Sequence, residues 1–114
     1  MTAVAEPPDL DALFGALADP TRRAIVARLT SGEATIKELA EPHDMTPQAI
    51  SQHARVLEEA GLITRGRHRQ TRPCRLEPDH LLAVTSWVEA RRAEWEDRHD
   101  RLADHLAQLQ EEQP

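Results

Sequence analysis

Four polar side chains in the middle of the chain are spaced so that they could read a surface by hydrogen bonding. Three- and four-residue spacings, which place side chains on one face of a helix, relate Gln48 to Ser51 and Gln52, and both of these to Arg55. Amide and hydroxyl groups can donate to and accept from base edges, and a guanidinium can pair with guanine or with phosphate. A polar helix face alone is usually a solvated surface, but a helix also fits the major groove of B-DNA, which is about 12 Å wide. Together with the basic segment that follows, this face predicts contact with double-stranded DNA.

A concentrated basic segment follows this helix directly. From Gly61 to Leu76 the chain has five arginines and no acidic residue, although its net charge is −6. Residues 62–65 and 72–76 are predicted to be short strands, and Pro73, which lacks an N–H, indicates that the second strand is an edge or is interrupted. Such a hairpin can be a solvated surface, but its position after the helix favours contact with phosphates or the minor groove. The arginines expected to make these contacts are Arg67, Arg69 and Arg72.

Four short helices are predicted before the hairpin, and they would hold the polar face in place. Asp19-Pro20 and Thr46-Pro47 are N-cap and first-turn pairs, and Thr35 to Glu38 forms a capping box. Helices three and four, each with its own cap, form a helix, a turn and a longer helix. Thr46, at the start of the fourth helix, can also approach phosphate through the free N–H groups there. The helices are expected over residues 10–17, from 20 to about 31, from 36 to about 41 and from 47 to 60.

One long helical pattern follows the hairpin, from about Pro78 to Gln108. Apolar residues recur in it every seven positions, at 81, 88, 95, 102 and 109. A long apolar seam on a terminal helix usually binds another helix, and three aromatic residues leave one chain short of large core side chains. These features predict a homodimer built on the terminal and first helices. Its expected interface residues are Leu10, Leu13, Leu81, Val88, Trp95, Leu102 and Leu106.

The expected fold is mainly α with a small β-hairpin, a winged helix-turn-helix with about five helices and a long C-terminal dimerisation helix. A chain of 114 residues with 39% hydrophobic and 30% charged residues suits one packed domain. We place that domain at residues 9–108, between a flexible tail at 1–8 and a C-terminal tail at 109–114. No apolar run reaches the roughly 20 residues of a membrane span, no secretory signal is visible, and the lone Cys74 cannot form an internal disulfide. We therefore expect a cytoplasmic protein without a membrane partner.

Three segments resemble the ArsR-type winged helix-turn-helix repressors. They are residues 13–23 (LFGALADPTRR), 36–40 (IKELA) and 46–63 (TPQAISQHARVLEEAGLI), within a resemblance that covers roughly residues 9–107. The stretch at 72–76 and the helix with Trp87 and Trp95 are similar to the subgroup that lacks metal sites. The resemblance implies a homodimer whose terminal helices pair and which represses a nearby operon, often including its own gene. It also implies a recognition helix that carries Gln48, Ser51, Gln52, His53 and Arg55.

His53 allows two interpretations. Its position beside Gln52, together with the resemblance, favours a phosphate or base contact. It also lies at the flank of the apolar row Ile50, Ala54 and Leu57, so it could instead be half-buried scaffold.

Metal sensing and enzyme chemistry are not favoured by the sequence. Metal sensors of this family often carry a Cys-x-Cys pair before the recognition helix, where this chain has no cysteine. Asp97-x-His99 matches half of a second ligand pattern, but its remaining positions are Gln110 and Gln113. Cys74 beside two arginines could be a redox switch, although a small apolar strand residue is the simpler interpretation. We find no Gly-rich phosphate loop, nucleophile elbow or paired carboxylates, so we expect neither an enzyme nor a cofactor.

The sequence thus predicts a sequence-specific DNA-binding regulator: a homodimeric repressor that does not respond to metals and whose targets can include its own gene. The alternative is a dimeric protein-interaction module whose helix-turn-helix has lost DNA binding, which the acidic flanks of the chain would suit. The operator and any small-molecule inducer are not specified by the sequence.

Overall fold

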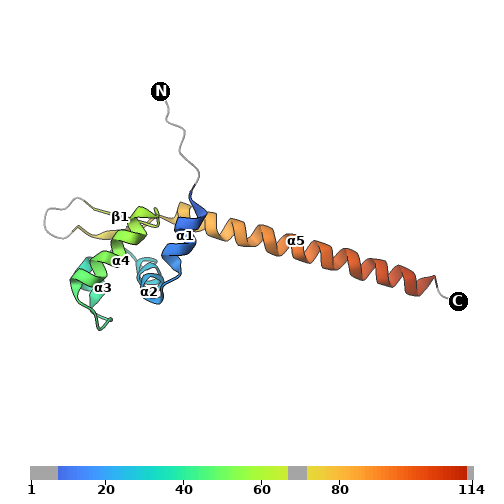
Figure 1. Cartoon of the computed structure of the whole chain (residues 1–114), viewed down its shortest axis with the longest axis horizontal. Helices are drawn as coiled ribbons and strands as arrows, with labels where there is room; N and C mark the ends of the chain where they lie inside the picture. The colour runs from blue at the N-terminus through green and yellow to red at the C-terminus, as the bar shows by residue number, and fades with distance from the viewer. Residues whose placement is uncertain (1–7, 67–71, 113–114) are drawn as a thin grey trace, which may run out of the picture. The chain divides into compact units, whose positions relative to one another are not determined.

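Five helices and one β-hairpin make up the part of the chain that the computed structural model describes, residues 8–66 and 72–112 (Figure 1). These residues divide into two compact units, with the boundary between Val84 and Thr85. The elements are α1 (Leu10–Leu17), α2 (Pro20–Leu29), α3 (Ile36–Ala40), α4 (Pro47–Glu59), β1 (Ile63–Arg65), β2 (Cys74–Leu76) and α5 (Pro78–Glu111). The expected fold class, mainly α with a small hairpin and a long last helix, is confirmed.

The helix starts are set by the local capping groups that the sequence predicts. The Asp19 carboxylate accepts from the N–H of Arg22, and the Thr46 hydroxyl accepts from the N–H of Ala49 at 3.1 Å. Thr35 and Glu38 form a reciprocal capping box at the start of α3. Each cap satisfies an N–H that the first helical turn leaves unpaired, and α2, α3 and α4 begin at the residues expected from the sequence.

The hairpin is shorter than the sequence suggests. Its antiparallel register pairs Ile63 with Leu76, Thr64 with Arg75 and Arg65 with Cys74. The second strand begins only after Pro73, as expected for a residue that has no N–H to donate to a ladder. Cys74 also exchanges both of its backbone hydrogen bonds with Ala34, at 2.7 and 3.1 Å, which ties the hairpin to the segment before α3.

One apolar core joins the elements of the first unit. The row of α4 that the sequence predicts to be buried, Ile50, Ala54 and Leu57, is fully buried, and so are Leu13 and Ile25 from the preceding helices. Leu62, Ile63 and Cys74 close the core from the hairpin side. Gly61, at φ +85°, makes the turn out of α4, and a β-carbon there would lie 2.6 Å from the His80 ring. The turn therefore requires glycine.

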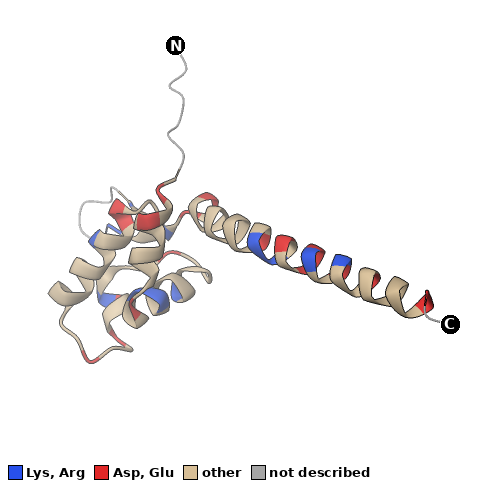
Figure 2. Ribbon diagram, turned by 45° about the vertical axis from the view of Figure 1, so that its right-hand side comes forward, with Lys and Arg blue, Asp and Glu red and all other residues tan. Residues whose placement is uncertain are grey.

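Helix α5 continues to Glu111, three residues beyond the expected end at Gln108. Leu81, Ala83 and Val84 on its first turns pack against the core of the first unit. From Thr85 onward every described residue of the helix is exposed. Arginines and carboxylates on this part alternate along the ribbon in Figure 2 and form ion pairs at three- and four-residue spacing, such as Arg91 with Glu94.

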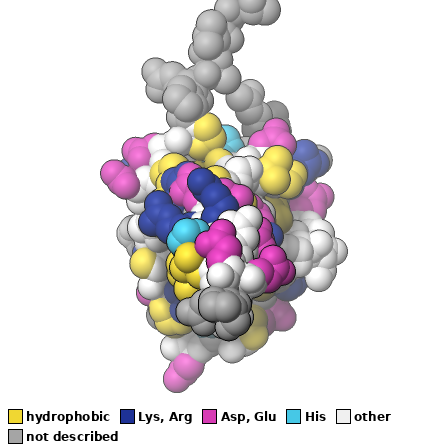
Figure 3. Space-filling model, turned by 90° about the vertical axis from the view of Figure 1, so that its right-hand side faces the viewer, with side chains coloured by type: hydrophobic (Ala, Val, Ile, Leu, Met, Phe, Trp, Pro, Cys, Tyr) yellow, Lys and Arg dark blue, Asp and Glu magenta, His cyan; other side chains and the backbone are white. Residues whose placement is uncertain are grey.

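Large apolar side chains are exposed between these charges. The second-unit members of this exposed set are Trp87, Val88, Trp95, Leu102, Leu106 and Leu109. Figure 3, viewed toward the C-terminal end of α5, shows hydrophobic side chains between basic and acidic ones. Within the described ranges, no helix is both long enough and apolar enough to cross a membrane.

Candidate nucleic-acid interface

The outward face of α4 is formed by the polar residues that the sequence singles out. Gln48, Gln52 and Arg55 are exposed, while Ser51 is half-buried at the edge that faces the hairpin. The opposite side of the same helix is the fully buried row described above, so α4 can expose this face only in one orientation. The Thr46 cap fixes the first turn, next to Gln48. The first turns of α4, capped by Thr46, are thus firmly packed, and the side chains of Gln48, Gln52 and Arg55 point outward.

Arg55 is the most available cation on this face. Its side chain is 71% exposed, and the carboxylate that it pairs with, Glu59, lies one turn further on at 3.2 Å. Such an exposed pair at i, i+4 contributes only a few tenths of a kcal/mol. An incoming phosphate or guanine can therefore replace it at little cost.

Arg65 differs from Arg72 and Arg75, the other described arginines of the hairpin, which are exposed. Its side chain is only 14% exposed, its Nη2 donates to the backbone oxygen of Ser51 at 3.0 Å, and its Nε lies 3.8 Å from Glu58 Oε1. It therefore links β1 to α4 instead of presenting charge to solvent. The sequence places Arg65 in the basic segment but gives no sign of this contact, since it joins residues 14 positions apart.

A surface hollow lies between α4 and the hairpin. Arg72, two residues before β2, is exposed and has a positive φ of 32°. Arg67 and Arg69, which the sequence also assigns to DNA contact, lie outside the described residues. The residues that line the hollow are Ser51, Gln52, Arg55, Glu58, Arg65 and Arg72.

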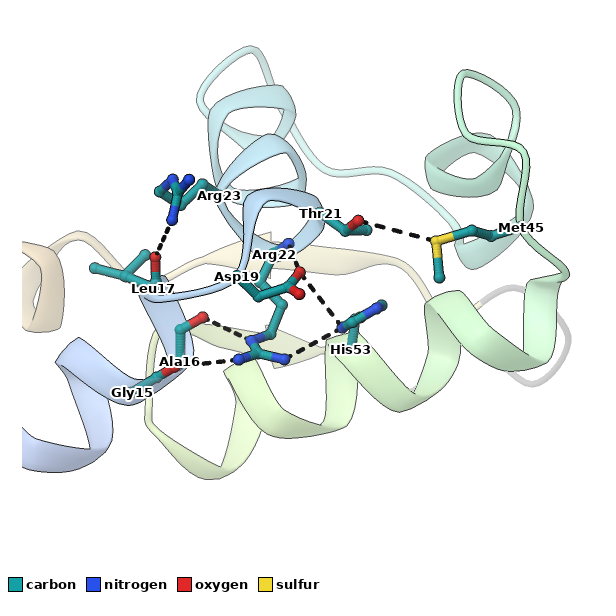
Figure 4. A network of polar contacts seen from close by, with 9 residues as sticks. All are labelled: Gly15, Ala16, Leu17, Asp19, Thr21, Arg22, Arg23, Met45 and His53. Atoms are coloured by element: carbon teal, nitrogen blue, oxygen red, sulfur yellow. Dashed lines mark hydrogen bonds and ion pairs between the residues drawn. The ribbon is translucent and has the colours of Figure 1, made fainter.

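His53 faces α2, not the polar face of α4. Its Nδ1 lies 3.3 Å from Arg22 Nη1 and 3.9 Å from the Asp19 carboxylate, and its side chain is 20% exposed (Figure 4). At about 100° per residue, His53 lies roughly 160° around the helix from Ser51 and about 100° from Gln52. This geometry favours the interpretation of His53 as a half-buried structural residue over that of a direct DNA contact.

Arg22 is a residue that the sequence reasoning did not assign. Its Nε donates to the Ala16 oxygen at 2.7 Å and its Nη2 to the Gly15 oxygen at 3.1 Å, while Nη1 faces His53. The hydrogen bond from the Arg22 N–H is the main cause that lowers the pKa of the Asp19 carboxyl. The available signal was the Asp-Pro-Thr-Arg stretch, which puts an arginine one turn after a helix cap.

The residues expected at a dimer interface fall into two groups. Leu13 is fully buried in the core of its own chain, so its side chain cannot itself touch a partner, and Leu10 and Leu81 are partly buried against the same core. For Leu13 this burial contradicts a direct interface role. The spacing of apolar residues identifies the apolar face of a helix, but it does not say which element covers that face. The remaining four, Val88, Trp95, Leu102 and Leu106, are 47%, 60%, 54% and 52% exposed.

Burial and ring stacking set the surroundings of the Cys74 thiol and the His99 ring. Cys74 is fully buried, and burial raises the pKa of its thiol, which favours the interpretation as an apolar strand residue over a redox switch. The His99 ring stacks on Trp95 with ring centroids 4.0 Å apart. In the ranges that the structure describes, no three His, Cys, Asp or Glu side chains group in a way that could hold a metal ion.

The chain has a helix-turn-helix, α3 and α4, whose second helix is buried on one side, and a β-hairpin that follows it. This order of elements defines a winged helix-turn-helix protein. Comparison with known proteins agrees, since residues 17–66 match the family described as a helix-turn-helix domain. The HTH-type transcriptional regulator Rv2034 of Mycobacterium tuberculosis is 40% identical over 74 residues, which are 65% of this chain and 69% of that protein. The transcriptional repressor SdpR of Bacillus subtilis is 36% identical over 58 residues, 51% of this chain and 64% of that protein.

Solved structures extend the likeness to most of the chain. The crystal structure of the ArsR family transcriptional regulator RHA00566 has a TM-score of 0.72 and 40% identity, over 76% of this chain and 96% of that one. The chain belongs to the ArsR family of winged helix-turn-helix transcriptional regulators, as its sequence motifs indicate.

Proposed function

We propose that this regulator is a repressor that binds an operator in double-stranded DNA as a homodimer, with α4 in the major groove. The observation that carries the proposal is the outward, capped polar face of α4 opposite a fully buried apolar row. Gln48 and Gln52 would read base edges, with Ser51 at the edge of the contact. Arg55 would pair with guanine or phosphate, in place of its exposed partner Glu59.

The hairpin would supply sequence-independent affinity. Arg72 is exposed beside the hollow next to α4, and Arg67 and Arg69 belong to the same loop in the sequence. Arginines on such a loop meet phosphates or a narrow minor groove without a fixed register. We assign base reading to α4 and backbone contact to these three arginines and to Thr46.

Dimerisation would use the exposed apolar row of α5. Val88, Trp95 and Leu102 recur every seven residues and are each about half exposed or more. A seven-residue repeat is the spacing at which two helices bury a continuous seam. A second copy of this chain would cover the row, and its recognition helix would read the second half of a two-fold operator.

We further propose that binding does not respond to metal ions and that the protein acts in the cytoplasm, where its DNA target is accessible. The proposal that metal ions have no effect rests on the metal-ligand pattern of the family's sensors. Gln110 and Gln113 occupy the two positions of this pattern where metal ligands would be needed. Zinc, cadmium, arsenite and chelators should leave the affinity for DNA unchanged. A metal that released the DNA at stoichiometric amounts would refute this part of the proposal.

A second candidate function is a dimeric protein-interaction module that has lost DNA binding. The acidic balance of the chain, −6 overall, favours it. The two candidates differ in one simple titration of the full chain with a short random duplex across a salt series. A repressor should bind even random DNA at roughly micromolar concentration with affinity that falls steeply as salt rises. Absence of binding at low salt would favour the interaction module.

A footprint on the DNA upstream of the protein's own gene then tests the repressor assignment. The proposal predicts a protected two-fold site with half-sites about one helical turn apart, or a multiple of that distance. Repression of a reporter through that site, abolished when the half-sites are changed, is the expected result. Activation of the reporter would contradict the assignment as a repressor.

A further inference from the structure

Two arginines of the first unit are directed into the protein and hold α4 from its two edges. Arg22 reaches α4 from α2, on the side of His53, and Arg65 reaches it from β1, on the side of Ser51. Ser51 and His53 lie about 160° apart around the helix axis. The Arg22 and Arg65 side chains therefore contact α4 on nearly opposite sides. We propose that Arg22 and Arg65 are positioning residues: they fix the rotation of the reading helix and do not bind DNA phosphate themselves. This inference rests on the proposed function of α4.

The contacts of Arg22 occupy all three nitrogens of its guanidinium. Two nitrogens donate to carbonyl oxygens near the C-terminal end of α1, Gly15 and Ala16, and the third faces His53 (Figure 4). One side chain on α2 thus joins α1 to α4. A guanidinium can do this because its donors form a rigid planar fork, which a lysine ammonium cannot reproduce.

This contact also assigns the proton of His53. Because a guanidinium can only donate, Nδ1 of His53 must accept and the proton of the neutral ring must sit on Nε2. Figure 4 shows that Nε2 lies on the far side of the ring from Arg22. The nearby carboxylate of Asp19 lies 3.9 Å from Nδ1, beyond hydrogen-bond distance.

Arg65 forms the corresponding contact at the other edge. Its side chain is 14% exposed, and it combines the hydrogen bond to the Ser51 oxygen with the nearby carboxylate of Glu58. Since Ser51 lies one residue before Gln52, a shift of this contact would move the reading face directly. Arg55 lies on α4, and its side chain is 71% exposed. It is therefore a suitable control for Arg22 and Arg65, because it is an arginine that points outward.

The test compares Arg22→Gln, Arg65→Gln and Arg55→Gln on a selected operator and on a scrambled duplex, across a salt series. Removal of a positioning residue should weaken operator binding about tenfold more than scrambled binding, while the slope of log affinity against log salt stays that of the wild type. Arg55→Gln should make the slope shallower by about one for each phosphate interaction that it removes, and by twice that in a symmetric dimer.

Three other results would overturn the inference. A shallower salt slope in Arg22→Gln or Arg65→Gln would mean that the arginine binds phosphate. An equal loss of affinity on both duplexes would mean that the variant only reduces the folded fraction, which circular dichroism would reveal. Lysine variants at both positions keep the charge, so full recovery of specificity in them would show that charge alone is needed.

A measurement on the free protein separates this inference from the proposed function. Nitrogen-15 spectra of the His53 ring should give the Nε2–H tautomer in the wild type and a different ring environment in Arg22→Gln. A proton on Nδ1 would overturn the Arg22 contact, whether or not the protein binds DNA.

Two His53 variants complete the test. An asparagine side chain at this position carries its polar group near the place of Nδ1, and a glutamine side chain carries it near that of Nε2. His53→Asn should therefore keep more operator specificity than His53→Gln. The reverse order would favour a direct DNA contact through Nε2.

Discussion

Replacing Trp95 with alanine should separate the two subunits of the proposed homodimer without unfolding either one. The Trp95 residue is 60% exposed in a single chain, and a tryptophan presents up to about 250 Å². About 150 Å² is then left for a partner to cover, which at about 25 cal/mol per Å² corresponds to an upper value of about 4 kcal/mol for each ring. Because a symmetric dimer holds two such rings, the dimer dissociation constant should rise at least about a hundredfold.

The assay is sedimentation equilibrium over a concentration series, with circular dichroism to follow the helices. Alanine is a strong helix former, so the helix content of α5 should change little. Asp104→Ala is the matched control, because Asp104 lies nine residues along, about half a turn around from Trp95, and is also exposed. Association of Trp95→Ala as tight as that of the control, or a monomeric wild type at micromolar concentration, would contradict this prediction.

The remaining predictions concern the helix caps and the buried thiol. Thr46→Ala should lower the free energy of unfolding by about 1 kcal/mol in urea titrations, since it removes the acceptor for the Ala49 N–H; no change would mean that the cap is dispensable. The thiol of Cys74 should react with a disulfide reagent only after unfolding, because it is buried and its pKa is raised by that burial, and fast reaction of the native protein would contradict this. The pKa values of Asp19 and Glu38 are lowered, chiefly by hydrogen bonds from the Arg22 and Thr35 backbone N–H groups. Their stabilising contribution is therefore present above about pH 4 and is lost as the pH falls further, so removing both carboxylates (Asp19→Asn with Glu38→Gln) should flatten the acid limb of a stability–pH curve.

The parts of the fold that sequence predicts well are those decided within one helical turn. The caps at Asp19, Thr35 and Thr46 each join groups three residues apart, and the buried row of α4 follows from helical spacing alone. The outward polar face of α4 is the complement of that row, so most of the candidate site is predictable before the structure.

Contacts between distant segments are the parts that sequence reasoning misses. Arg65 appears in the sequence as one more cation of a basic hairpin, yet it packs inward against Ser51. His53 appears beside Gln52 on the reading helix, yet it contacts Arg22, 31 residues earlier. Leu13 is expected at the dimer interface, although the core of its own chain covers it completely. In each case the spacing defines a face of an element, and only the fold decides what covers that face.

The most direct test of the central claim is the effect of Gln52→Ala on sequence discrimination. Fluorescence anisotropy should be measured for wild type and variant on an operator selected from a random duplex pool and on a scrambled duplex. If α4 reads bases, the variant should lose about 1–3 kcal/mol on the operator and little on scrambled DNA. An equal loss on both duplexes, or none on either, would contradict the account of α4 as the reading helix.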